Sequence, residues 1–249
     1  AAFYNKEASI NAFLSDSKSR WDCASQRAAL AAAGGKKKGI AMSYIDVSWG
    51  SGMNMVDCSK DASGMWKNKL CGVLDAAGLE VMNSAAYTGG AYDYSQFATF
   101  AADADFFLIA DMDCKYKNLA NNASCYGFWK DTFLSHLNVM KAFKNQMIYD
   151  VGRTMDPAGG TDYLVSVPVE PDALLADVIS VVYPVAAAGH NRVYLRNMLT
   201  ESVGNMEACV DNTQPYGCLP SAAYLASQCT SLGAAADSIA KFAGIVLCP

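Results

Sequence analysis

Two spacings of apolar residues run through the first 200 positions of the chain. Apolar residues three, four or seven apart predict helices, because one helix face then meets the core. Short apolar runs between turn residues predict buried strands. We expect helices at residues 2–33, 65–77, 95–102, 128–143 and 171–182. We expect strands at residues 39–47, 79–82, 105–110 and 147–149.

Glycine and proline mark the ends of these elements. Gly34–Gly35 is expected to end the first helix and Gly78 the second, since glycine readily takes the C-terminal cap conformation. Pro171 suits the first turn of the last helix, and Pro184 ends it. The first helix is expected to turn inward a face made of Phe3, Ile10, Leu14, Trp21 and Ala28.

The order of the elements predicts the fold class. Alternating strands and helices predict an α/β fold, here a Rossmann-like lobe with a mostly parallel sheet flanked by helices. A long helix (residues 1–35) precedes this lobe (36–200), and a Cys-rich helical extension (201–249) follows it, where Ala, Ser and Cys dominate. Such sheets bind ligands beyond the carboxyl ends of their strands. The candidate ligand loops are therefore 44–54, 83–94 and 151–170.

Aromatic and charged residues in these loops are candidate ligand contacts. A flat or aromatic ligand would suit Trp49 with its neighbours, the alternative being a packed Trp beside a turn Asp. Arg153 would meet an anionic group with its planar guanidinium, the alternative being a structural arginine that holds the loop through carbonyl oxygens. The expected ligand-binding residues are Tyr44, Asp46, Trp49, Tyr87, Arg153 and Tyr163.

Composition narrows the function classes. The chain has 249 residues, of which 52% are hydrophobic and 17% charged. It lacks an uncharged apolar run of about 18 residues, so no transmembrane segment of its own is expected. A net charge of −5 argues against a nucleic-acid partner.

Enzyme motifs are missing from the sequence. There is no GxSxG, GxGxxG or P-loop motif, and neither His136 nor His190 lies beside a nucleophile motif. Two histidines and no CxxC pair argue against zinc. Asp111 and Asp113 would suit a metal, but a solvated strand end is the favoured alternative. We therefore expect no catalytic residue and no resident metal.

Nine cysteines favour an oxidising compartment, which means a secreted, periplasmic-like or organelle-lumenal protein. An odd number leaves one thiol over, and we expect this to be Cys23, free or bonded to another chain. A glycosylation sequon at Asn122 fits a surface loop of an exported protein. The disulfides expected from close spacing are Cys58–Cys71, Cys114–Cys125, Cys209–Cys218 and Cys229–Cys248.

Several segments in a fixed order carry a family resemblance. They are FYNKE at 3–7, QMIY at 146–149, GGTDY at 159–163, EPDALLADVI at 170–179 and HNRVYLRN at 190–197. Over residues 3–200 the chain resembles the C-terminal lobe of the helical-backbone (class III) periplasmic substrate-binding proteins, in their eukaryotic Cys-bearing branch. FYNKE resembles the end of the helix that joins the two lobes of such proteins.

The resemblance implies a non-enzymatic carrier of the kind that delivers siderophores, haem or cobalamin to ABC importers. The implied ligand is an iron chelate or a tetrapyrrole, and no other cofactor is expected. The chain opens on the inter-lobe helix, so the first lobe is expected to be absent or only missing from this chain. The implied partner is that upstream lobe of the same precursor, or a membrane protein complex.

One departure from the family pattern supports a different function. Val165-Ser166-Val167 stands where relatives carry a charged pair around the serine, which removes a plausible ligand clamp. The alternative is an accessory or scaffold subunit that has kept the fold without transporting a ligand. Such a subunit would dock on a larger membrane complex, for example a photosynthetic or other lumenal assembly.

Overall fold

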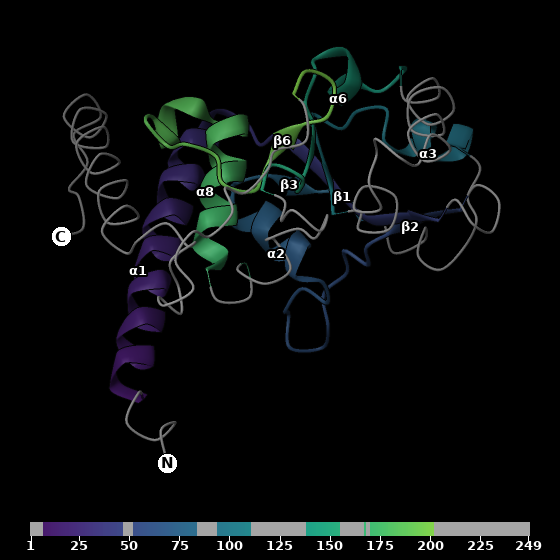
Figure 1. Ribbon diagram of the computed structural model, residues 1–249. Coiled ribbons are helices and arrows are strands. Elements are labelled where there is room, and N and C mark those ends of the chain that lie inside the picture. Colours follow the sequence, from purple (N-terminus) through teal and green to yellow (C-terminus); the bar gives the residue numbers. More distant parts are fainter. Residues whose placement is uncertain are drawn as a thin grey trace.

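The computed structural model describes residues 7–46, 52–83, 94–110, 138–154, 167 and 170–201 (Figure 1). The helices are α1 (Glu7–Ala31), η1 (Ala32–Gly34), α2 (Lys69–Ala76), α3 (Tyr94–Phe100), α6 (Lys141–Lys144), α8 (Pro171–Val182) and η4 (Pro184–Ala187). The strands are β1 (Lys38–Asp46), β2 (Gly52–Met55), β3 (Glu80–Val81), β4 (Phe106–Ile109), β5 (Ile148–Asp150) and β6 (Arg196–Asn197).

The described strands form one six-stranded sheet in the order β2-β1-β4-β5-β6, with β3 also paired to β1. The pairs β1–β3, β1–β4 and β4–β5 are parallel. The pairs β1–β2 and β5–β6 are antiparallel. The prediction of an α/β fold with a mostly parallel sheet is confirmed, although strands β2 and β6 were not predicted.

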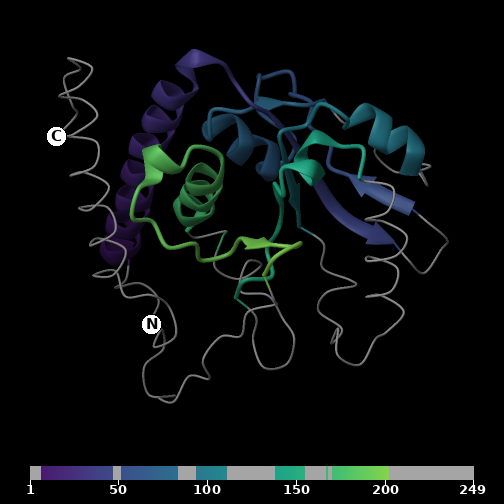
Figure 2. The same cartoon turned by 90° about the horizontal axis from the view of Figure 1, so that it is seen from above.

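Strand β4 explains why helices cover both faces of the sheet. All four of its residues are buried, and successive side chains of a strand point to opposite faces. Phe106 and Leu108 join a core cluster with residues of α1, α2 and α8. Phe107 and Ile109 join a second cluster with residues of α3 and α6. Figure 2 shows α1 (purple) and α8 (green) on one side of the strands and α3 (blue-teal) on the other.

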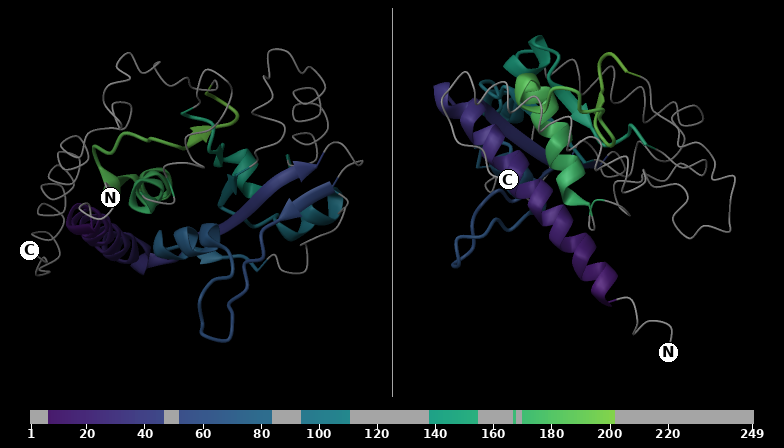
Figure 3. Two further views of the ribbon diagram at one scale, coloured as in Figure 1. Left: turned by 60° about the horizontal axis from the view of Figure 1, so that its bottom comes forward. Right: turned by 90° about the vertical axis from the view of Figure 1, so that its left-hand side faces the viewer.

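Helix α1 packs along α8 through small and polar residues (Figure 3, right). Ala28 of α1 and Ala32 of η1 are buried in the cluster that α8 residues also form, and the buried Ser17 hydroxyl donates to Asp172 at the start of α8. Leu14 was predicted to face the core, but 49% of it is exposed. The prediction is wrong because α8 begins at Pro171, beside Ser17, and so does not extend as far as Leu14. The side chains of Phe3 and Ile10 lie outside the described residues.

Two predicted helices differ from the structure within the described residues. Helix α2 starts at Lys69 rather than 65, because the Asn68 side chain caps it by accepting the Leu70 N–H at 2.9 Å. Residues 138–140, predicted to be helical, form a turn, and Met140 is extended (φ −70°, ψ 140°), so α6 begins only at Lys141. Residues 128–137 lie outside the described part.

The predicted loop 44–54 is largely strand. Asp46 pairs with Gly52 and Tyr44 with Asn54, which makes β1 and β2 two arms of a hairpin. The polar and glycine residues of β2 suggested a turn, but its backbone completes the hydrogen bonding of β1. Residues 47–51, which connect the arms, lie outside the described part.

The predicted disulfide Cys58–Cys71 is confirmed, with the two Cα atoms 5.4 Å apart and both residues buried. It closes the loop before α2 onto that helix. Cys23 is exposed on α1 and has no disulfide partner among the described residues. The predicted pairs Cys114–Cys125, Cys209–Cys218 and Cys229–Cys248 lie outside these residues and stay predictions. No helix in the described part is long and apolar enough to cross a membrane.

Candidate functional site

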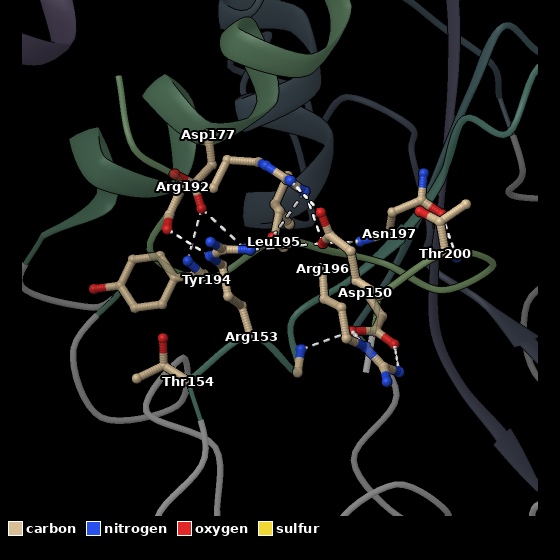
Figure 4. Close-up of polar contacts among 12 residues, drawn as sticks. Asp150, Arg153, Thr154, Asp177, Arg192, Tyr194, Leu195, Arg196, Asn197 and Thr200 are labelled. Carbon is tan, nitrogen blue, oxygen red and sulfur yellow. Dashed lines mark hydrogen bonds and ion pairs between the residues drawn. The ribbon is translucent and has the colours of Figure 1, made fainter. Parts of the chain in front are cut away.

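The candidate site lies at the carboxyl end of β5, where the start of loop 151–170 meets the segment 190–201 (Figure 4). The backbone N–H of Arg153 donates to the Tyr194 carbonyl at 3.1 Å, and the Thr154 hydroxyl donates to the Val193 carbonyl. Two segments about forty residues apart in sequence are thereby joined at the edge where parallel α/β sheets bind ligands.

Asp177 of α8 fixes the backbone of the segment 190–201. Its carboxylate is fully buried, and His190 Nε2 lies 2.6 Å from its Oδ1. The carboxylate also accepts the backbone N–H groups of Val193, Tyr194 and Leu195 at 2.7 to 3.0 Å. A buried carboxylate needs such partners, and here they set the course of the segment 190–201 beside α8.

A second buried ion pair joins β5 to β6. Arg196 donates through Nε to Asp150 Oδ1 at 3.2 Å and through Nη2 to Oδ2. Asp150 Oδ1 also accepts the Gly152 N–H at 2.7 Å. A Cβ on Gly152 would come within 3.0 Å of that oxygen, so the close approach favours glycine.

Arg153 and Arg192 converge on one carboxylate, that of Glu201. Arg192 is paired with Glu201 through both terminal nitrogens, with Nη1 at 3.1 Å from Oε2. Arg153 Nη1 lies 3.6 Å from the same Oε2. The side chains of Arg153, Arg192 and Glu201 are 41%, 21% and 31% exposed, so water reaches this group of charges.

The electrostatics of this group follow from its partly buried position. Burial alone would raise the pKa of Glu201, but hydrogen bonds from Arg192 and the Asn197 N–H, with the charges of both arginines, outweigh it. The pKa of Glu201 therefore lies below its ordinary value. Burial would lower the pKa of Arg192, but its bonds to Glu201 raise it overall. The pair stays ionised at neutral pH.

Arg153 is the predicted ligand residue whose side chain the structure describes. Its Nε donates to the Arg192 carbonyl at 2.8 Å, which is the contact expected of the structural alternative. Tyr44 and Asp46 occupy the end of β1, but only their backbone is described. Trp49, Tyr87 and Tyr163 lie outside the described residues. Ligand contact by all six residues stays a prediction.

The sequence did not single out the other charged residues of the site. Of these, Glu201 pairs with Arg153 directly, and the Arg192 carbonyl accepts the Nε–H of Arg153. Asp150, Asp177 and Arg196 shape the surrounding chain. One available signal was Asp177, a charged residue among the buried apolar residues of α8. A charged side chain is rarely buried unless it is paired, so the position of Asp177 indicated that it has polar partners elsewhere in the chain.

The described part of the site presents two partly exposed arginine side chains, Arg153 and Arg192. Within the described residues, no three His, Cys, Asp or Glu side chains come together as a metal site. Arginine side chains bind carboxylate and phosphate groups in a planar, two-pronged geometry. The chain is thus an α/β lobe with an arginine-bearing polar edge. No protein-family model, curated protein or solved structure matches it.

Proposed function

We propose that this chain is a non-enzymatic ligand-binding module whose ligand lies beyond the carboxyl ends of β1, β4 and β5. These strands are parallel, so their carboxyl ends reach the same edge of the sheet. The residues predicted to contact ligand on β1, Tyr44 and Asp46, stand at that edge with Arg153 after β5.

The position of Arg153 is the observation that carries this proposal. The residue lies shortly after Asp150, the last residue of β5, and both its backbone and its Nε are held by carbonyl oxygens of the segment 190–201. A partly exposed guanidinium held in this way has little conformational freedom left to lose when it binds an anion, and this pre-organisation favours affinity. The sequence resemblance to siderophore, haem and cobalamin carriers suggests an anionic iron chelate or a tetrapyrrole.

The compartment proposed is exported or organelle-lumenal. The disulfide Cys58–Cys71 supports it, because disulfides persist in oxidising surroundings. In that setting the module would hold its chelate for a membrane importer, with an upstream lobe or a membrane protein as partner.

Direct titration tests this proposal. Haem, ferric citrate and cobalamin would each be titrated into the protein while tryptophan fluorescence is followed, with calorimetry to confirm any saturable change. We expect one anionic probe to bind, and Arg153→Gln to weaken it about tenfold or more, as expected for a lost charged hydrogen bond. Arg27→Gln on α1 is the matched control and should bind like the wild type. Failure of all three probes to saturate would reject the proposal.

A docked scaffold subunit is the second candidate function. The observation in its favour is the loop 59–67, which projects from the body of the lobe below α2 (Figure 1; Figure 3, left). The loop is closed by Cys58–Cys71, braced by the Lys60–Trp66 bridge, and carries Met65 with 66% exposed. A rigid projecting loop with an apolar tip suits a protein partner.

Native mass spectrometry of the gently purified particle separates the two candidates. A particle containing this chain within a large membrane complex, and released by Met65→Asp, favours the scaffold. A chain that carries a chelate, with or without an upstream lobe, favours the carrier.

A further inference from the structure

The contact of Arg153 and Arg192 with Glu201 has the form of an occupied anion site. The two arginines come from different segments, one after β5 and one before β6, and both point at a single carboxylate. All three side chains are partly exposed. In contrast, the neighbouring pair Asp150–Arg196 is buried on both sides and has the burial of a purely structural contact.

The positions of the two arginines depend on contacts other than Glu201. Arg192 Nη1 also donates to the Leu195 carbonyl at 3.2 Å, and its guanidinium lies 5.4 Å from the ring centre of Tyr149. Arg153 Nε donates to the Arg192 carbonyl at 2.8 Å. Figure 4 draws both arginines within the same group of polar contacts. The arginine pair would therefore persist if the carboxylate moved away.

Glu201 itself is held by a turn. Its carboxylate accepts the Asn197 N–H at 2.9 Å, and its own N–H donates to the Asn197 carbonyl at 3.0 Å. It belongs to no helix or strand, so moving its side chain breaks the bond from the Asn197 N–H but no hydrogen bond between strands. The site thus combines a fixed pair of cations with a removable anion.

We propose that Arg153 and Arg192 form the anion-recognition site of the lobe, and that Glu201 is an internal occupant which a ligand's anionic group displaces. This inference rests on the proposed ligand-binding function and names its chemistry, a carboxylate or a phosphate. Both groups match the geometry of arginine. Because Glu201 competes for the arginines, the affinity for ligand is reduced by the fraction of time that the site is occupied internally.

Removing the competing carboxylate tests this directly. Citrate and inorganic phosphate would be titrated calorimetrically, at low ionic strength, into the full chain and into Glu201→Gln. We expect Glu201→Gln to bind one of them about tenfold or more tightly than the wild type does. The anion whose affinity increases shows whether the site recognises a carboxylate or a phosphate. The double variant Glu201→Gln/Arg153→Gln should lose this gain. Glu80→Gln, which removes an exposed glutamate of β3, should leave binding unchanged.

A second variant guards against misfolding. Glu201→Asp keeps the negative charge, but its shorter side chain should not reach both arginines, so it should also gain affinity. The inference is overturned if neither variant binds either anion more tightly than the wild type, or if the gain survives Arg153→Gln. Chelate binding with no gain in Glu201→Gln would reject the inference and leave the proposed function standing. Tighter binding of citrate by Glu201→Gln, without binding of any chelate, would support the anion site and reject the proposed carrier function.

Discussion

The buried carboxylate of Asp177 accepts the backbone N–H of Tyr194 at 2.7 Å, across a separation of 17 residues. It accepts the N–H groups of Val193 and Leu195 as well, so one side chain of α8 orients the segment that carries Arg192 and Arg196. The geometry of the candidate site therefore depends on a residue that need not touch a ligand.

Replacing Asp177 with Asn should destabilise the protein. The amide keeps one acceptor but turns an NH2 group toward N–H donors and removes the charge, which should cost about 2–3 kcal/mol of unfolding free energy. Urea denaturation measures this cost. The control is Asp22→Asn, an exposed acid of α1 paired with Lys18, which should change the free energy by less than about 0.5 kcal/mol. Equal effects in the two variants would contradict the role given to Asp177.

Two glycines with positive φ provide a matched comparison of backbone strain and packing. Gly78 (φ +75°) ends α2, and a Cβ there would come within 2.9 Å of the Ala28 carbonyl of α1. Gly64 (φ +81°) lies in the loop 59–67, where a Cβ would meet nothing within 4 Å. Gly64→Ala should therefore cost only the strain of the left-handed conformation, about 1–2 kcal/mol.

Gly78→Ala should cost about 1–3 kcal/mol more than Gly64→Ala, because the helices α1 and α2 must separate to admit the methyl group. Thermal and urea unfolding of both variants would measure the difference. If the two variants lose equal stability, the close approach of α2 to α1 at Gly78 is not as described.

The disulfide Cys58–Cys71 should stabilise the fold by restricting the unfolded chain. The bond joins residues 13 apart, and closing a loop of this size is worth about 3 kcal/mol. The double variant Cys58→Ala/Cys71→Ala should lose about that much, measured by urea denaturation without reductant. Cys23→Ser, which changes the exposed thiol of α1, should unfold like the wild type. Equal stability of the double variant and the wild type would show that the bond contributes nothing.

The sequence was sufficient for elements with a long or strongly apolar pattern. Strands β1 and β4 and helix α8 lie close to their predicted bounds, because periodicity and proline positions are properties of the local chain. Strands β2 and β6 were missed, since GMNM adjoins a glycine-bearing turn signal in the sequence and RN is too short to show any periodicity. They are strands because their backbones pair with β1 and β5, which the local sequence does not encode.

The candidate site was predictable only in part for the same reason. Arg153 was found because it lies in a loop that follows a strand. Its relation to Arg192 and Glu201 depends on the path of the chain after α8, and Asp177 sets that path through contacts distant in sequence. Single residues could be named from the pattern, but their convergence required the fold.

Acid should weaken the contact between Arg192 and Glu201. The pKa of Glu201 lies below its unfolded value of about 4.3, so near that pH the unfolded state binds more protons than the folded state. The stability due to this pair is therefore complete well above pH 4.3 and is lost as the pH falls through the lower, folded-state pKa.

Glu201→Gln should be less stable than the wild type at pH 7, by up to about 1 kcal/mol for a partly exposed pair. The two proteins should converge in unfolding free energy as the pH falls below about 4.3, measured by urea denaturation at a series of pH values. A difference that does not shrink as the pH falls would mean that Glu201 acts through packing and not through its charge.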